Sequence, residues 1–187
     1  MKRNYVMLAA GLGTAVLVSG LAANAYAQGQ FGQGATQKRV STASTVANNV
    51  TTTQQLSGSE AAQLQYMLEE EKLAHDVYVA LYDKWGVQIF NNISKSESTH
   101  ESKLQTAASY YSVPDVRTSE AGVFTNQQLQ VLYDQLIEKG MQSTTDAYEV
   151  GKLIEEQDIK DLHATVAITD SAYLKNVYAA LTKGSQN

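Results

Sequence analysis

The stretch that decides the fold is EEEKLAHDVYVALYDKWG, residues 69–86. Its apolar residues recur every three or four positions, which is the period of an α-helix that buries one face. Gly86 follows the last aromatic residue, and glycine is common just past a helix C-terminus. Upstream, Ser57 and Glu60 have the spacing of a capping box, so the first helix is predicted over residues 58–85. Its buried stripe would consist of Leu64, Met67, Ala74, Val77, Tyr78, Leu81 and Trp85.

Helix-capping and helix-breaking residues predict four more helices after Gly86. The first and third of these four are long, the second is short, and the last follows closely on the third. The signals are Pro114 after a helix over residues 88–111, a capping box of Thr125 with Gln128 before a short helix that Gly140 ends, Ser143 with Asp146 before a helix to about Ala167, and Thr169 or Asp170 as cap of a helix to Lys183. This order predicts an all-α protein, an up-down four-helix bundle with a short extra helix in one long crossover.

The second predicted helix carries two polar residues within its apolar stripe. At 100° per residue, Glu97 and His100 align with the apolar residues, so both side chains are predicted to point into the core. Burying a carboxylate and an imidazole is costly unless they pair with each other or bind a cation. A satisfied ion pair and a metal site both remain open. The stripe consists of Phe90, Ile93, Glu97, His100, Leu104, Ala107 and Tyr111.

Inward acids are predicted on two other helices. Glu70 and Glu71 flank the stripe of the first helix, and the helical period does not choose between them. Glu155 and Asp158 lie on the stripe of the helix that follows Ser143. Acids from three helices and one imidazole are ligands typical of a carboxylate-bridged di-iron or di-manganese site. We predict that Glu149, Glu156 and His163 lie on the solvent side, outside this site. His75 lies at the edge of the first-helix stripe and is predicted to be a surface residue or a partner of a ligand.

Composition limits the kinds of site and partner. The 187 residues include three histidines and no cysteine, which excludes disulfides and thiolate metal sites. Residues 1–27 have the basic, apolar and small-residue regions of a secretory signal, and we expect cleavage after Ala27, with a retained membrane anchor as the alternative. Removing Lys2 and Arg3 leaves 12 basic and 19 acidic side chains, a net charge of −7. This charge argues against nucleic acid and anionic membranes as partners.

Residues 28–56 differ in composition from the predicted bundle domain at residues 57–187. They are rich in Gln, Gly, Ser, Thr and Asn, with too little apolar surface to fold alone, which predicts a flexible tether. The stretch VSTASTVANNVTTT is β-branched, so it offers an alternative role as an added strand in a homo-oligomer or filament.

The first-helix motif resembles that of ferritins and rubrerythrins. In EKLAHDVY, residues 71–78, Glu71 is followed by Ala74 and Tyr78 at the spacing that this family shows after its ligand glutamate. The resemblance implies that Glu71, rather than Glu70, is the ligand. It also implies that Tyr78 hydrogen-bonds a carboxylate ligand or passes an electron.

The second-helix motif ESTHESKL, residues 97–104, is similar to the Glu-x-x-His segment of the same family. The resemblance implies that Glu97 bridges and that His100 is the imidazole ligand. With FNNISKSESTH and IEEQDIKDL, the chain more closely resembles a group of prokaryotic ferritin-like proteins of unknown function, over about residues 60–187. A ferritin-like four-helix bundle is therefore expected.

The last predicted helix departs from this family. The family has a second Glu-x-x-His there, whereas neither Glu nor His follows Asp170 in this sequence. The resembled group is expected to have a His directly after GSxN, and this sequence ends at Asn187. We therefore expect a mononuclear, asymmetric, water-filled or vestigial site whose second half comes from Glu155 and Asp158.

The expected function is that of an exported iron-binding protein, periplasmic, extracellular or at the cell surface. Manganese is the alternative metal, and the resemblance implies oxygen, peroxide or iron redox handling, with an external electron donor because no rubredoxin-like cysteine module is present. A metal-free surface or matrix module that assembles through residues 28–56 is the competing interpretation. Inward acids without a metal would burden the stability of such a module.

Overall fold

A computed structural model describes residues 55–186. This part of the chain is all-helical, as predicted, with five helices and no strand. The predicted signal segment and almost the whole predicted tether lie outside the described residues. The helices are α1 (Gly58–Trp85), α2 (Gln88–Tyr110), α3 (Gln127–Gly140), α4 (Thr144–Ile168) and α5 (Ala172–Ser185).

Both ends of α1 form as the sequence predicts. The Ser57 hydroxyl accepts a hydrogen bond from the Glu60 N–H, and the Glu60 carboxylate accepts one from the Ser57 N–H, which completes the capping box. Gly86 has φ of 65°, a left-handed conformation that favours glycine, and its N–H bonds the Tyr82 carbonyl.

The predicted caps of α3 and α5 are wrong by one or two residues. Asn126, not Thr125, caps α3, because the Thr125 N–H and hydroxyl both donate to Glu69 on α1. Ser171, rather than Thr169 or Asp170, caps α5, because the Thr169 hydroxyl donates to the Glu60 carboxylate. In both cases a contact between distant segments takes the side chain that local spacing assigns to the cap.

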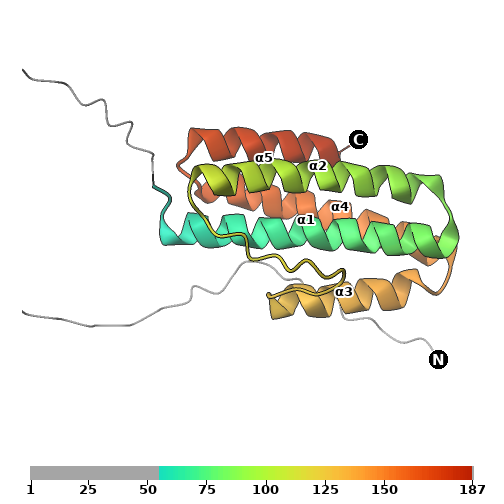
Figure 1. Cartoon of the computed structure of the whole chain (residues 1–187). Helices are drawn as coiled ribbons and strands as arrows, with labels where there is room; N and C mark the ends of the chain where they lie inside the picture. The colour runs from blue at the N-terminus through green and yellow to red at the C-terminus, as the bar shows by residue number, and fades with distance from the viewer. Residues whose placement is uncertain (1–54, 187) are drawn as a thin grey trace, which may run out of the picture. The chain divides into compact units, whose positions relative to one another are not determined.

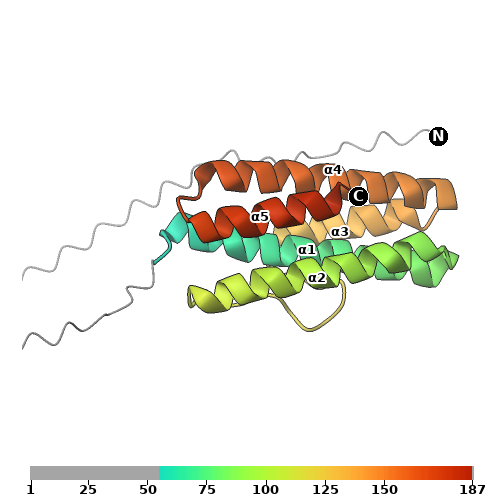
Figure 2. The same ribbon diagram turned by 90° about the horizontal axis from the view of Figure 1, so that it is seen from above.

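Helices α1, α2, α4 and α5 form a four-helix bundle, and α3 packs against the outside of that bundle (Figure 1). Around the bundle α1 contacts α2, α2 contacts α5, α5 contacts α4, and α4 contacts α1. Helix α3 packs on α1 and α4 along one edge of the bundle. Figure 2 shows the same arrangement from above, with α2 and α4 on different sides of α1.

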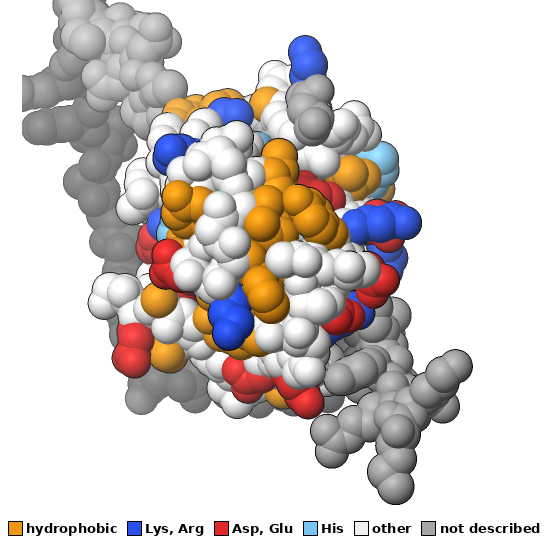
Figure 3. Space-filling model, turned by 90° about the vertical axis from the view of Figure 1, so that its right-hand side faces the viewer, with side chains coloured by type: hydrophobic (Ala, Val, Ile, Leu, Met, Phe, Trp, Pro, Cys, Tyr) orange, Lys and Arg blue, Asp and Glu red, His pale blue; other side chains and the backbone are white. Residues whose placement is uncertain are grey.

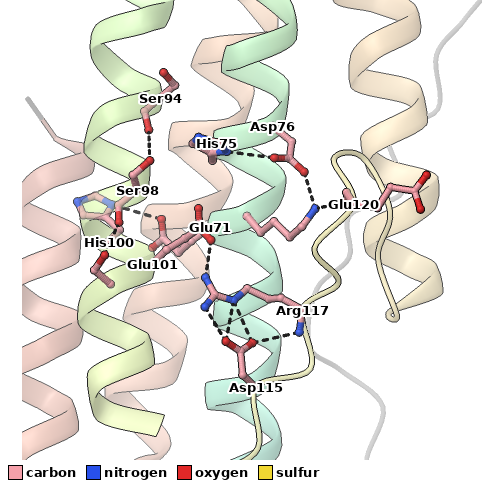
Figure 4. A network of polar contacts seen from close by, with 12 residues as sticks. Glu71, His75, Asp76, Ser94, Ser98, His100, Glu101, Asp115, Arg117 and Glu120 are labelled. Atoms are coloured by element: carbon pink, nitrogen blue, oxygen red, sulfur yellow. Dashed lines mark hydrogen bonds and ion pairs between the residues drawn. The ribbon is translucent and has the colours of Figure 1, made fainter. Parts of the chain in front are cut away.

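The crossover between α2 and α4 spans the length of the bundle (Figure 1). Because this connection contains α3, α4 runs in the same direction as α2. The loop before α3 is tied to α1: Lys72 donates to the Glu120 carbonyl at 2.9 Å, and the Gly122 N–H donates to Asp76 at 2.9 Å. Arg117 of the same loop pairs with Glu101 on α2 (Figure 4).

Two apolar clusters form the core, and the predicted acids lie between them. On each of α1, α2 and α4, the acids fall in the interval between a residue of one cluster and a residue of the other. Apolar packing above and below therefore fixes a polar layer in the middle of the bundle. The flanking pairs are Leu68 and Leu73 on α1, Phe90 and Leu104 on α2, and Ile154 and Leu162 on α4.

The surface of the described part is mixed in character. Apolar side chains gather at the end where α1 gives way to α2 and α3 to α4 (Figure 3). At the starts of α2 and α4, Ile89 and Tyr148 are among the exposed large apolar residues. Within residues 55–186, no helix has the length and apolar character needed to cross a membrane.

Candidate metal centre

The centre of the polar layer is a trio of buried residues from α1 and α2. Nδ1 of His100 lies 3.2 Å from Oε2 of Glu71 and 3.2 Å from Oε2 of Glu97. One ligand atom from each residue lies within 4.8 Å of the others, and no residue of the trio is more than 3% exposed. Figure 4 shows His100 reaching from α2 toward Glu71. This spacing suits a single metal ion between two carboxylates and an imidazole.

The local structure of α2 explains why two of the three point inward together. Glu97 and His100 are three residues apart, so they lie on one face of the helix one turn from each other. The opposite edge of the imidazole packs on the last turn of α5, where a Cβ added to Gly184 would lie 2.3 Å from Nε2 of His100. The glycine therefore allows the ring to sit with Nδ1 toward the carboxylates.

Glu155 on α4 lies beside the trio. Its Oε1 accepts a hydrogen bond from the Tyr78 hydroxyl at 2.7 Å, and the same hydroxyl lies 3.1 Å from the Gly151 carbonyl. Burial, together with the charge of Glu97, raises the pKa of Glu155 to about 7, although the Tyr78 hydrogen bond acts to lower it. A carboxyl group with this pKa exchanges a proton near neutral pH.

Asp158, one turn after Glu155, is buried, and only one of its two carboxylate oxygens is hydrogen-bonded. Its Oδ2 accepts a hydrogen bond of 2.7 Å from the Ser185 hydroxyl at the end of α5, whereas Oδ1 has no partner. Burial raises its pKa to about 6, and the charges of Glu97 and His100 act on it in opposite directions. Asp158 therefore interacts electrostatically with two residues of the trio.

The layer has a surplus of negative charge. Burial, then the charges of Asp158 and Glu97, raise the pKa of Glu71 well above its ordinary value, and Oε1 of Glu71 has no hydrogen-bond partner. Lys72 follows Glu71 in sequence but bonds Asp76 and Glu120 on the α3 side. A buried carboxylate with a free oxygen and no cation is destabilising, and a metal ion would remove that cost.

The structure therefore brings most of the predicted residues into one layer. Glu71, Glu97 and His100 form one buried group that could hold a metal ion, and Glu155 and Asp158 of α4 interact electrostatically with it. Tyr78 hydrogen-bonds Glu155, one of the carboxylates predicted for the site. The residues predicted outside the site are outside it: His75 bonds Asp76 and is 31% exposed, and Glu149, Glu156 and His163 are exposed.

Sequence reasoning missed a second group of polar residues in the same layer. Glu70, the residue that the motif sets aside, is as buried as the ligand candidates, with only 6% exposed. Asp161 on α4 is 2% exposed, and its charge raises the pKa of both Glu70 and Tyr66. The signal was present, because Asp161 follows Asp158 by three residues and so lies on the same helix face.

A family model described as "Uncharacterized protein domain (DUF2202)" matches residues 60–187. The chain is 46% identical over 135 residues to "Uncharacterized protein MJ0754" of Methanocaldococcus jannaschii, and the match covers 72% of this chain and 73% of the relative. The crystal structure of hypothetical protein MJ0754 from Methanococcus jannaschii DSM 2661 has a TM-score of 0.70 to this chain, with 46% identity, and the match covers 72% of this chain and 77% of that one. Residues 60–187 include all five helices except the first two residues of α1.

Proposed function

We propose that this chain, which belongs to the DUF2202 family, binds a transition metal ion, in the first place iron, through Glu71, Glu97 and His100. The observation that carries the proposal is the buried trio, whose ligand atoms lie within 4.8 Å of one another. Without a cation, this arrangement buries two acids against a single imidazole.

The donor set supports iron or manganese over other metals. Two carboxylates and one imidazole are hard and borderline ligands, and the absence of cysteine removes the thiolates that softer metals prefer. The preference for iron rests on the resemblance of the α1 and α2 motifs to ferritins and rubrerythrins. The parallel run of α2 and α4, joined by a long crossover, is the connectivity that ferritin-like bundles use.

Other residues of the layer would assist the bound ion. Glu155 completes the donor set from α4, and the Tyr78 hydroxyl holds it in place at 2.7 Å. Asp158 is held by Ser185 and leaves one oxygen free for the layer. A bound iron ion would supply one-electron redox chemistry, and the nearby Glu155 would hold or release a proton near neutral pH.

Residues 1–27 have the pattern of a secretory signal, so we propose that the protein works outside the cytoplasm. We propose that it acts there on oxygen, peroxide or iron. Because the chain has no cysteine and so no rubredoxin-like module, electrons would come from an external donor.

The test compares two histidines that differ in environment. His100→Ala removes the buried imidazole, and His163→Ala removes an exposed one from α4. Titration of metal-depleted protein with Fe²⁺ under argon and with Mn²⁺ should show affinity weakened at least about tenfold by His100→Ala, because one of three ligands is lost. His163→Ala should change nothing, and circular dichroism should report the same helix content for both. Equal metal affinity in the two variants would disprove the assignment.

A further inference from the structure

Two exposed tyrosines contact each other where α2 ends and α5 begins. The ring centroids of Tyr110 and Tyr173 lie 5.2 Å apart, and the two residues are 55% and 38% exposed. Tyr110 is the last residue of α2 and Tyr173 is in the first turn of α5, at the same end of the bundle (Figure 1). Gly184, which contacts His100, lies roughly 16 Å further along α5, from the rise per residue of a helix. The tyrosine pair is therefore separate from the trio.

A buried tyrosine holds both exposed rings in place. The ring of Tyr111 is edge-on to that of Tyr110 at 4.8 Å and lies 6.1 Å from that of Tyr173. The Tyr111 hydroxyl lies 2.5 Å from the Ser171 hydroxyl, which also caps α5 by accepting a hydrogen bond from the Leu174 N–H. The two exposed rings thus pack on a base that is fixed to both helices.

Tyr148 shows that exposure alone does not bring two phenols together. It is 53% exposed, but its ring packs on Phe90, with the centroids 5.4 Å apart. Within residues 55–186, the contacts between two tyrosine rings all lie among Tyr110, Tyr111 and Tyr173. A phenol radical formed on Tyr110 or Tyr173 therefore already has a second exposed phenol beside it, and such proximity favours coupling within one molecule.

We propose that Tyr110 and Tyr173 form a site of oxidative cross-linking, at which hydrogen peroxide and a peroxidase join the two rings as dityrosine. Each phenol gives up one electron and one proton, and the two radicals form a carbon–carbon bond between the ring positions next to their hydroxyls. The hydrogen on each of these carbons then moves to the oxygen of its own ring, which restores both phenols. The two electrons and two protons reduce one hydrogen peroxide to two water molecules.

The cross-link would join two helices that are far apart in the sequence. The chain between them contains the crossover, α3 and α4. A covalent bond that closes such a loop restricts the unfolded chain and so raises the stability of the folded one. The sequence has no cysteine, so no disulfide can provide this restriction. The site goes beyond the proposed function, since it uses no residue of the trio and needs no bound metal.

The experiment treats metal-depleted full-length protein, at low micromolar concentration, with hydrogen peroxide and a haem peroxidase. Size-exclusion chromatography separates monomer from dimer, and dityrosine fluorescence and intact mass are measured on the monomer. The variants are Tyr110→Phe and Tyr173→Phe, which keep the ring and remove the phenol. Tyr148→Phe is the matched control, because it removes an exposed phenol that contacts no other tyrosine ring.

Wild type and Tyr148→Phe should give a fluorescent monomer that is lighter by two hydrogen atoms, with the peptides of Tyr110 and Tyr173 joined. Fluorescence of the monomer should fall at least about tenfold in Tyr110→Phe and in Tyr173→Phe, because the neighbouring phenol is lost. Cross-linked wild type should also melt at a higher temperature than untreated wild type.

Monomer fluorescence in Tyr110→Phe or Tyr173→Phe that equals the wild type would overturn the site. Dityrosine found only in dimers, or in no sample, would overturn it as well. An unchanged melting temperature of the cross-linked monomer would overturn the stabilising role. None of these results depends on whether the trio binds a metal.

Discussion

Three neighbouring glutamates of α1 have three different roles because each faces a different partner. Glu69 accepts hydrogen bonds from the start of α3, so its charge is compensated by N–H and hydroxyl donors. Glu71 lies 3.2 Å from Nδ1 of His100, whereas the buried Glu70 interacts electrostatically with Asp158 and Asp161 of α4. Successive residues of a helix differ by 100° in direction, which is how one run of identical residues supplies a structural contact to α3 and two acids to the polar layer.

The sequence predicts the residues of α2 better than those of α1. Glu97 and His100 lie at the centre of an apolar stripe, and burial follows directly from the helical period. Glu70 and Glu71 lie on either side of a stripe, so which one is buried depends on the neighbours of α1. Because α1 touches α2, α3 and α4, nearly its whole circumference is covered in this region, and both acids are buried.

Tyr78→Phe tests the link between Tyr78 and Glu155. The hydroxyl lowers the pKa of Glu155 through its hydrogen bond, so its loss should raise that pKa above about 7. Metal binding that uses ionised Glu155 should then shift to higher pH by about one unit, from the usual strength of a hydrogen bond to a carboxylate. The pH dependence of Fe²⁺ and Mn²⁺ affinity measures this.

Tyr178→Phe is the control for that experiment. The Tyr178 hydroxyl is buried without a hydrogen-bond partner, so its removal should leave the pH profile of metal binding unchanged and should not lower the melting temperature. A pH profile in Tyr78→Phe that matches the wild type would show that Glu155 is not part of the metal centre.

At the scale of elements, the last turn of α5 contacts two residues of the polar layer. Gly184 lies against the imidazole of His100, and Ser185 donates to Asp158. The sequence predicts that α5 ends before Gly184, whereas the helix includes Gly184 and Ser185. Glycine is a reliable helix-end signal only where no other element needs the space of its missing side chain.

Gly184→Ala should separate helix stability from metal binding. Alanine is the better helix former, so helix content should be kept, but the added Cβ would lie 2.3 Å from Nε2 of His100 and force the ring to move. Affinity for Fe²⁺ should fall at least about tenfold, as expected when a ligand loses its orientation.

Gly58→Ala is the matched control, because a Cβ at Gly58 meets nothing within 4 Å. It should keep both helix content and metal affinity. Wild-type affinity in Gly184→Ala would mean that the position of His100 does not depend on α5.

The helix-capping errors have a common physical cause. Ser57 and Glu60 cap α1 as predicted, since both partners are local. Thr125 and Thr169 are both diverted by glutamates of α1 that lie far away in sequence. Local spacing therefore predicts that the five helices exist, but not which hydroxyl caps a helix that packs against another.

At the scale of the whole molecule, two apolar clusters enclose a layer of acids that has few compensating charges. The clusters provide the burial that stabilises the bundle, and the same burial raises the pKa of Glu71, Glu155 and Asp158. The metal-free protein therefore holds a layer that is destabilising when it is ionised. Its fold class was predictable from helical periodicity, whereas the full membership of the layer was not.

Metal-free protein should be more stable at pH 5 than at pH 8. The pKa of Glu155 rises from 4.5 to about 7 and that of Asp158 from 3.8 to about 6, so the folded state binds more protons than the unfolded state in this range. The free energy of unfolding therefore falls as pH rises toward 7. Urea denaturation at several pH values measures the slope.

Two further samples check the origin of this slope. The free energy of unfolding of the double variant Glu155→Gln/Asp158→Asn should depend less on pH than that of wild type. The pH dependence that remains should include a contribution from His75, whose pKa is also raised. Saturating Mn²⁺ should reverse the slope, because the bound cation favours ionised carboxylates. A wild-type slope that the double substitution leaves unchanged would mean that these acids do not control the stability.

Elemental analysis of wild-type protein and of His100→Ala, both purified without chelator or an affinity metal, tests the central claim most directly. The trio predicts iron, or manganese in its place, at about one ion per chain in the wild type, with loss of that ion in His100→Ala. Wild-type protein that carries no metal, and takes up none when Fe²⁺ and Mn²⁺ are supplied, would contradict the account.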